Sequence, residues 1–146
     1  MTAAPGAGDD DLARLLQDMD PLLDPETFVV VTAPPGTDLS TLRPFAVIAE
    51  TEGPTAIVTS GRLAEALTLG CTPADPPPMA RITLQVHSSL LAVGLTAAVA
   101  AALAAVDISC NVIAGYFHDH LLVPVERAAD ALDVLRSLQA GPDGPG

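Results

Sequence analysis

The sequence predicts an α+β protein of the ferredoxin-like kind, with antiparallel sheets that carry their helices on one face. The second half of the chain shows this most directly. Its pattern predicts the order strand, helix, strand, strand, helix. The supporting segments are, in turn, an alternating run, an alanine-rich block, two further apolar runs and an amphipathic block. That order is the split βαβ arrangement with its last strand missing. The first half predicts the order helix, strand, strand, strand, helix. We therefore expect two interlocked βαββαβ-type copies, in which residues 27–32 of the first half complete the sheet of the second copy.

Composition places the chain among globular proteins. Its 146 residues fit one domain or two very small ones, and a hydrophobic content of 49% is enough for a core. The net charge is −12 and the six basic residues are scattered arginines, so no basic stripe is available for the phosphate backbone of a nucleic acid. The absence of lysine excludes Schiff-base and phosphate-loop chemistry. Two cysteines make neither a disulfide framework nor a zinc motif.

Proline and glycine divide the chain into five stretches. We expect a disordered N-terminus over residues 1–10, a first module over 11–70, a proline-rich linker over 71–79, a second module over 80–139 and a disordered tail over 140–146. The N-terminal residues lack a basic stretch followed by an apolar one, so no secretory signal is expected. The expected compartment is the cytoplasm.

The first half opens with a predicted amphipathic helix. Apolar residues recur at helical spacing from Leu12 to Met19, and three aspartates precede them, where negative charge stabilises a helix N-terminus. Asp20 and Pro21 are expected to end this helix.

Three strands and a short helix follow. Residues 27–32 are β-branched and aromatic, which predicts a buried strand. Residues 45–50 and 55–59 predict a hairpin. Residues 60–67 predict a short helix, whose first residue, a serine, is expected to cap it. Cys71 borders the proline-rich linker and is expected to be exposed.

A segment without charge dominates the second half. No charged residue occurs between Arg81 and Asp107, so we expect the whole segment to be buried. Residues 81–87 alternate like a strand, and the alanine-rich block that ends at residue 106 favours a helix. A membrane span is the alternative, but it needs about 20 apolar residues, and the run 90–106 is shorter and lacks basic flanks. We therefore expect a core helix and no membrane partner.

The chain ends with two strands and a helix. Residues 108–115 and 121–125 predict the strands, and residues 126–138 predict a helix with one apolar face. Cys110 is expected to be a small core residue. Asn111 is polar in an apolar strand and is expected to need a buried partner.

The loop between the uncharged strand and the uncharged helix is the candidate binding site. There the first backbone N–H groups of a helix meet a short polar loop, an arrangement that suits a small anionic ligand. The alternative explanation is structural: Ser88 or Ser89 caps the helix and Gly94 permits close packing. The candidate ligand-binding residues are His87, Ser88, Ser89, Leu90, Val93, Gly94 and Asn111.

Metal binding and catalysis have weaker support in the sequence. His118 and His120 would share one strand face, and imidazole suits zinc, copper or nickel, but no further ligand is specified. We expect polar hairpin residues, with no metal and no cofactor. Serine, histidine and aspartate are present without a Gly-x-Ser-x-Gly motif, so no enzyme activity is expected.

Two runs together resemble a known family. ITLQVHSSLLAVGLTAAV (residues 82–99) and ISCNVIAGYFHDHLLVPV (residues 108–125) resemble small uncharacterised bacterial proteins made of tandem ACT domains. The resemblance is close over residues 81–138 and looser over 19–67. It implies a ferredoxin-like fold, duplication within the chain, a homodimer, and the sensing of an amino acid or similar metabolite. The alternative function is a structural or interaction module that binds nothing small.

The loop departs from the best-known ACT effector loops. Those loops carry Asp or Asn and then Pro-Gly, whereas this chain has Ser88-Ser89 and a later Gly94, closer to the serine-containing loops of the aspartate-kinase-like branch. ACT modules usually regulate an attached enzyme, and none is attached in this sequence.

Overall fold

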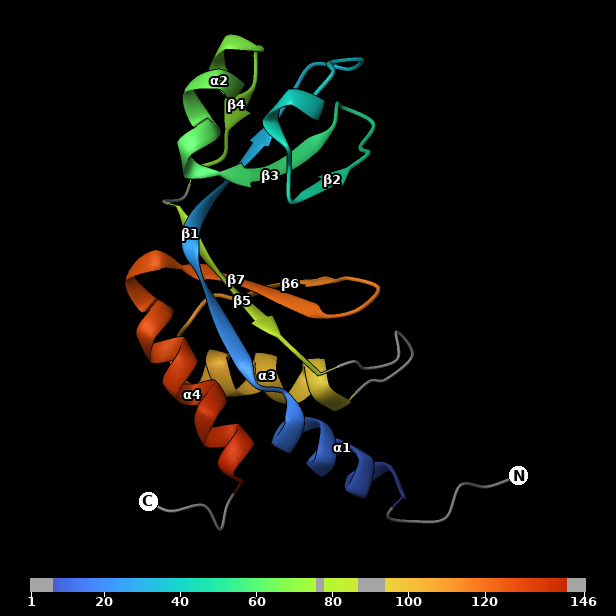
Figure 1. Cartoon of the computed structure of the whole chain (residues 1–146), viewed down its shortest axis with the longest axis vertical. Coiled ribbons are helices and arrows are strands. Elements are labelled where there is room, and N and C mark those ends of the chain that lie inside the picture. Colours follow the sequence, from blue (N-terminus) through green and yellow to red (C-terminus); the bar gives the residue numbers. More distant parts are fainter. Residues whose placement is uncertain (1–6, 76–77, 87–93, 142–146) are drawn as a thin grey trace, which may run out of the picture. The chain divides into compact units, whose positions relative to one another are not determined.

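The computed structural model describes residues 7–75, 78–86 and 94–141 (Figure 1). The chain divides into two compact units. The terminal unit combines both ends of the chain, Met1–Asp24 and Arg81–Gly146, and the central unit is Pro25–Ala80. Residues far apart in sequence therefore build the terminal unit together.

Strands of the terminal unit follow the order β1, β5, β7, β6. Their bounds are β1 (Pro21–Thr32), β5 (Met79–Leu84), β6 (Asn111–Ala114) and β7 (Asp119–Pro124). Only Pro21–Asp24 of β1 and Arg81–Leu84 of β5 belong to this unit. The β6–β7 hairpin is antiparallel, and its register places Asn111 opposite Leu122. In β5, Ile82 and Leu84 are buried and alternate with the half-buried Arg81 and Thr83, as expected for a strand with one face on a core.

In the described part of the terminal unit the α-helices are α1 (Ala7–Asp18), α3 (Gly94–Ala105) and α4 (Ala128–Ala140), the last preceded by the 3₁₀ turn Val125–Arg127. They lie on one side of its strands (Figure 1). The predicted first and last helices are thus confirmed. The class predicted from the pattern, an α+β fold with antiparallel strands and helices on one face, is confirmed as well.

Helix α3 corrects one expectation. Its buried side chains are Leu95, Val99 and Leu103, one per turn, whereas Ala97 and Ala101 are among several exposed alanines. A helix on one face of a sheet buries a single stripe. The uncharged segment is therefore not buried as a whole. Among the described residues, no helix is long and apolar enough to cross a membrane.

The central unit is built around β3 (Thr55–Thr59), which pairs antiparallel with β1 and with β2 (Ala46–Ile48). The short strand β4 (Thr72–Pro73) also pairs with β1. The remaining elements are two 3₁₀ turns, Ser40–Leu42 and Ser60–Arg62, and helix α2 (Leu63–Thr68). The predicted hairpin of residues 45–50 and 55–59 is confirmed.

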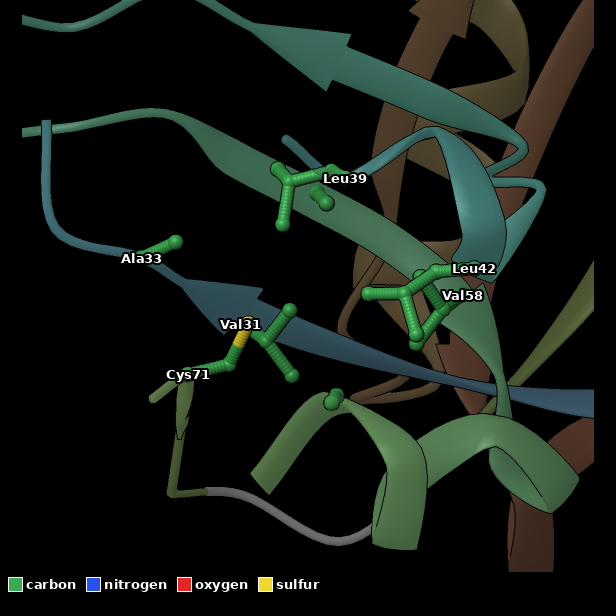
Figure 2. Close-up of a cluster of buried hydrophobic side chains, with 8 residues drawn as sticks. Val31, Ala33, Leu39, Leu42, Val58 and Cys71 are labelled. Atoms are coloured by element: carbon green, nitrogen blue, oxygen red, sulfur yellow. The ribbon is translucent and has the colours of Figure 1, made fainter. Parts of the chain in front are cut away.

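A small apolar cluster holds the central unit together (Figure 2). It consists of Val31, Ala33, Leu39, Leu42, Ala56, Val58, Ala66 and Cys71. These residues come from two strands, the first 3₁₀ turn, α2 and the segments beside them, so β1, β3, the first 3₁₀ turn and α2 contribute to one core. Cys71 is only 5% exposed. The expectation that it is exposed is wrong, because β4 follows it directly and returns the chain to the sheet.

Two other expectations for the first half are wrong. Residues 28–32 do not complete the second half of the chain but pair with Thr55–Thr59 in the central unit, and it is Pro21–Asp24, earlier in the same strand, that belongs to the terminal unit. Ser60 is not an N-cap: Thr59 holds that position for the 3₁₀ turn and Arg62 holds it for α2. The Ser60 hydroxyl lies 2.6 Å from that of Thr27 instead, and this hydrogen bond joins β1 to the residue that follows β3.

Candidate functional site

The candidate site falls partly within the described structure. His87, Ser88, Ser89, Leu90 and Val93 lie outside the described residues. Gly94 is the first residue of α3 and Asn111 is the first residue of β6. The described neighbours of the candidate loop are thus the end of β5 on one side and the start of α3 on the other.

The chain enters the candidate loop from an anchored position. The backbone N–H of Gln85 donates a 2.7 Å hydrogen bond to the carbonyl of Met19. The side-chain Nε2 of Gln85 donates to the Asp20 carbonyl at 3.1 Å and to Asp20 Oδ2 at 3.0 Å. Met19 is fully buried, and Asp20 has a positive φ of 40°, which is uncommon for a residue with a side chain. Three hydrogen bonds therefore tie the end of β5 to the turn between α1 and β1.

The chain leaves the candidate loop at a second contact with the same segment. A Cβ atom on Gly94 would lie 3.1 Å from Leu12 Cδ1 and 3.3 Å from Leu12 Cδ2. Leu12 of α1 thus packs directly over the first residue of α3. Part of the requirement for glycine at this position is structural, because any larger residue must displace Leu12.

Asn111 does not lie in the buried environment that the sequence predicted for it. Its side chain is exposed and its backbone pairs with Leu122 of β7. It does not need the buried partner that its place in an apolar strand suggested, because β6 is the last strand in the order and its alternate positions reach solvent.

A polar cluster that the sequence did not reveal lies on β1, β5 and β7 of the terminal unit. Arg81 Nη2 lies 2.5 Å from Asp24 Oδ2, and a 2.9 Å hydrogen bond joins the Thr83 hydroxyl to His120 Nδ1. Arg81 and Thr83 alternate with buried residues in β5, so period-two spacing could have placed them on one face. Their partners could not be found that way, because they come from other strands.

Burial and positive neighbours shift one histidine. Burial lowers the pKa of His120 below 6.5, and the charges of Arg81 and His118 lower it further, against a smaller opposite effect of Asp119. His118 Nδ1 is buried without a hydrogen-bond partner among the described residues. In those residues, no three or more His, Cys, Asp or Glu side chains are arranged to hold a metal ion.

A hollow of about 670 Å³ lies between α1, α3 and α4. Apolar side chains such as Leu16, Val134 and Leu138 line it, and its polar lining side chains, Gln17, Ser137 and Gln139, are neutral. The volume is typical of small-molecule sites. None of the candidate ligand-binding residues lines it, and no charged side chain among the described residues does.

Comparison with protein families gives two matches. Residues 7–73 match the ACT domain, and residues 80–137 match the ACT domain a second time. The first match includes α1 and the first residues of β1, which belong to the terminal unit. A comparison with curated proteins gave no match.

Solved structures with a similar fold include three from bacteria. A protein of unknown function from Vibrio cholerae, described as a possible transport protein, is 39% identical, covers 91% of this chain and 99% of its own, and has a TM-score of 0.76. The regulatory subunit of aspartate kinase from Thermus flavus is 14% identical, with coverage of 81% and 95% and a TM-score of 0.63. A protein from Agrobacterium tumefaciens is 14% identical, with coverage of 78% and 84% and a TM-score of 0.62. At 14% identity, the likeness concerns the fold alone.

Proposed function

Two ACT domains in tandem make this chain a member of the ACT-domain family, and from that premise we propose that it is a non-catalytic regulatory protein that senses an amino acid. The tandem match carries the proposal. It is supported by the shared fold of the regulatory subunit of aspartate kinase, a protein whose stated role is regulation.

The proposed ligand site is the loop that precedes α3, formed by His87, Ser88, Ser89, Leu90, Val93 and Gly94, with Asn111 as a further candidate. The first N–H groups of a helix lack intrahelical partners, and a ligand carboxylate would accept charge-assisted hydrogen bonds from them. No charged side chain of α3 competes for such a ligand.

The ammonium group of an amino acid needs an acceptor. Asp20 offers one, because Gln85 Nε2 holds its carboxylate at the end of β5, where the chain enters the proposed loop. The carboxylate is exposed and retains acceptor capacity beyond this one hydrogen bond. We therefore include Asp20 in the proposed site.

The hollow between the helices is a poorer candidate for the same ligand. An amino acid carries a carboxylate and an ammonium, and burying either without a partner is costly. The described lining of the hollow has no charged side chain. Its chemistry suits an uncharged molecule rather than a zwitterion.

Chemistry at the cysteines supports a role without catalysis. Burial raises the pKa of Cys71 and of Cys110 above the ordinary value. A nucleophilic cysteine needs the opposite shift, because the thiolate is the reactive form. The two thiols are suited to packing rather than to catalysis.

An interaction module is the second candidate function. Tyr116 and Phe117 lie between β6 and β7 with exposed fractions of 77% and 66%, and their ring centroids are 4.8 Å apart. Exposed neighbouring aromatic side chains are typical of protein interfaces. We propose a homodimer on this basis, and the cytoplasm remains the compartment expected from the sequence.

A thermal-shift screen against the standard amino acids tests the function. A ligand at 100 times its Kd should stabilise the protein by about 2.7 kcal/mol. Asp20→Asn should then weaken binding of the amino acid found, while leaving binding of the matching carboxylic acid without an amino group unchanged. If no amino acid raises the melting temperature and light scattering shows a stable dimer, the interaction module replaces the sensor.

A further inference from the structure

We propose that the turn of the β6–β7 hairpin docks into the hollow between α1, α3 and α4 of a second copy of this chain, and that the second copy returns the contact. The hairpin tip, Tyr116 and Phe117, and the hollow both belong to the terminal unit. The inference gives a docking mode to the proposed homodimer and rests on that part of the proposed function. It does not depend on whether an amino acid binds.

The hairpin tip is a tightly closed turn that presents two aromatic rings. The backbone N–H of Gly115 donates a 2.9 Å hydrogen bond to the carbonyl of His118, which leaves only Tyr116 and Phe117 between them. A Cβ on Gly115 would lie 2.8 Å from the same carbonyl oxygen, so the turn leaves no room for a side chain there. The two rings are packed edge to face. A preorganised tip of this kind loses little conformational entropy when it binds.

Turn chemistry does not account for the aromatic residues. Two-residue hairpin turns favour pairs such as Asn-Gly, because their common forms need positive φ angles. Neither Tyr116 nor Phe117 has a positive φ. Both side chains are largely exposed, at the end of the hairpin away from α4 (Figure 1), so they add little to the core of their own copy. Aromatic side chains contribute most to interface energetics once they are buried. The tip is therefore suited to burial in a partner.

The hollow has the size and chemistry to receive the tip. Its volume of about 670 Å³ is typical of sites that enclose drug-sized molecules, and two aromatic side chains are no larger than such a molecule. Apolar side chains, among them Leu16 and Leu138, line it. A buried Tyr116 hydroxyl needs a hydrogen-bond partner. The lining residue Ser137 donates its hydroxyl to the carbonyl of Asp133 at 3.0 Å and retains the capacity to accept.

Charge restricts where two copies can meet. Each copy has a net charge of −12, so two copies repel one another, and a stable contact must use surfaces that add no further repulsion. The tip is uncharged, and the described lining of the hollow carries no charged side chain. Each copy therefore has both an uncharged projection and an uncharged receptor. Reciprocal docking about a two-fold axis uses both pairs and closes the assembly as a dimer.

Substitutions on each side of the contact test the docking. The tip variant carries Tyr116→Ser and Phe117→Ser, and Ala102→Trp fills the hollow from α3. The matched control is Ala101→Trp, which places the same side chain on α3 at an exposed position outside the hollow lining. We expect sedimentation equilibrium to show a dimer Kd at least about thirtyfold higher in the tip variant and in Ala102→Trp, and unchanged in Ala101→Trp. Circular dichroism checks the fold, and Ala13→Trp fills the hollow from α1 if Ala102→Trp does not fold.

Mixing the two weakened variants tests reciprocity. The tip variant keeps its hollow and Ala102→Trp keeps its tip, so a mixed pair can form one native contact, whereas each variant alone forms none. We expect native mass spectrometry to show a heterodimer in the mixture that is tighter than either homodimer and weaker than the native one. A mixture without heterodimer would overturn the proposal.

Other interfaces give different results. Val47, on the edge strand β2, is an apolar side chain with an exposed fraction of 52%. Loss of the dimer in Val47→Lys, with the tip variant still dimeric, would place the interface on that edge and overturn the docking mode while keeping the homodimer. A monomeric native chain would overturn both and leave the hollow to an uncharged small molecule. The thermal-shift screen decides amino-acid sensing separately from all of these outcomes.

Discussion

Arg81 and Asp24 are separated by 56 residues in the chain, yet the Nη2 atom of one lies 2.5 Å from Oδ2 of the other. Both side chains are about one-fifth exposed. The pair joins the beginning of β1 to β5, at the boundary where the chain passes from the terminal unit to the central unit and back. It therefore marks the place where the two ends of the chain are assembled into one unit.

Breaking this ion pair should destabilise the protein. Arg81→Ala removes the cation from a largely buried carboxylate, and we expect a loss of about 2 kcal/mol in the free energy of unfolding. The matched control is the exposed pair Arg127–Asp130, whose side chains are 35% and 65% exposed. Asp130→Asn should cost less than about 0.5 kcal/mol. Urea denaturation of both variants measures the difference, and equal losses would contradict the expectation.

His120 should make stability depend on pH. Because its pKa in the folded state is below 6.5, the unfolded chain binds more protons between the two pKa values. The contribution of this residue is therefore complete above the unfolded pKa and falls as the pH is lowered through 6.5 towards the folded pKa. His120→Gln should remove that part of the pH dependence in urea titrations. An unchanged pH profile in the variant would assign the dependence to other groups.

The charge of His118 is one cause of the His120 shift, after burial and Arg81. In His118→Gln, the pKa of His120 should therefore rise towards its ordinary value. Nuclear magnetic resonance of the imidazole protons measures it directly. A fall in the His120 pKa would mean that His118 acts through something other than its charge.

Gly53 should be intolerant of any side chain. Its φ is +141°, and a Cβ would lie 2.1 Å from the carbonyl oxygen of Ala33. We expect Gly53→Ala to cost more than about 3 kcal/mol, through backbone strain and displacement of the neighbouring chain. Gly61→Ala is the control, because nothing lies within 4 Å of its Cβ position. Thermal melts compare the two variants, and similar melting temperatures would rule out the close approach.

The terminal unit should not form from the second half alone. Residues 81–146 lack the fully buried Met19 and the first strand that neighbours β5, so an exposed sheet edge would remain. We expect this fragment to melt without cooperativity. A chain in which a short glycine-serine linker replaces residues 25–80 should melt cooperatively, because it restores both. Cooperative melting of the short fragment would show that the N-terminal segment is dispensable.

Local patterns determined the identity of nearly every element. Helical spacing before Asp20-Pro21 predicted α1, and a turn between two β-branched runs predicted the β2–β3 hairpin. Each of these elements depends on residues within one helical turn or one hairpin. Residues that are close in sequence are therefore enough to predict whether a segment forms a helix or a strand. The ACT resemblance came from two such runs, and both halves of the chain match that domain.

Tertiary structure alone decided which side chains meet. The sequence could not show that residues 28–32 pair with Thr55–Thr59, that Ser60 forms a hydrogen bond with Thr27, or that Cys71 is buried. Each of these contacts depends on strands that are distant in sequence and adjacent in the sheet. Nor could it show that Gly94 lies under Leu12. Periodicity assigns a residue to a face of its own helix or strand, but the packing of other segments against that face determines its partner.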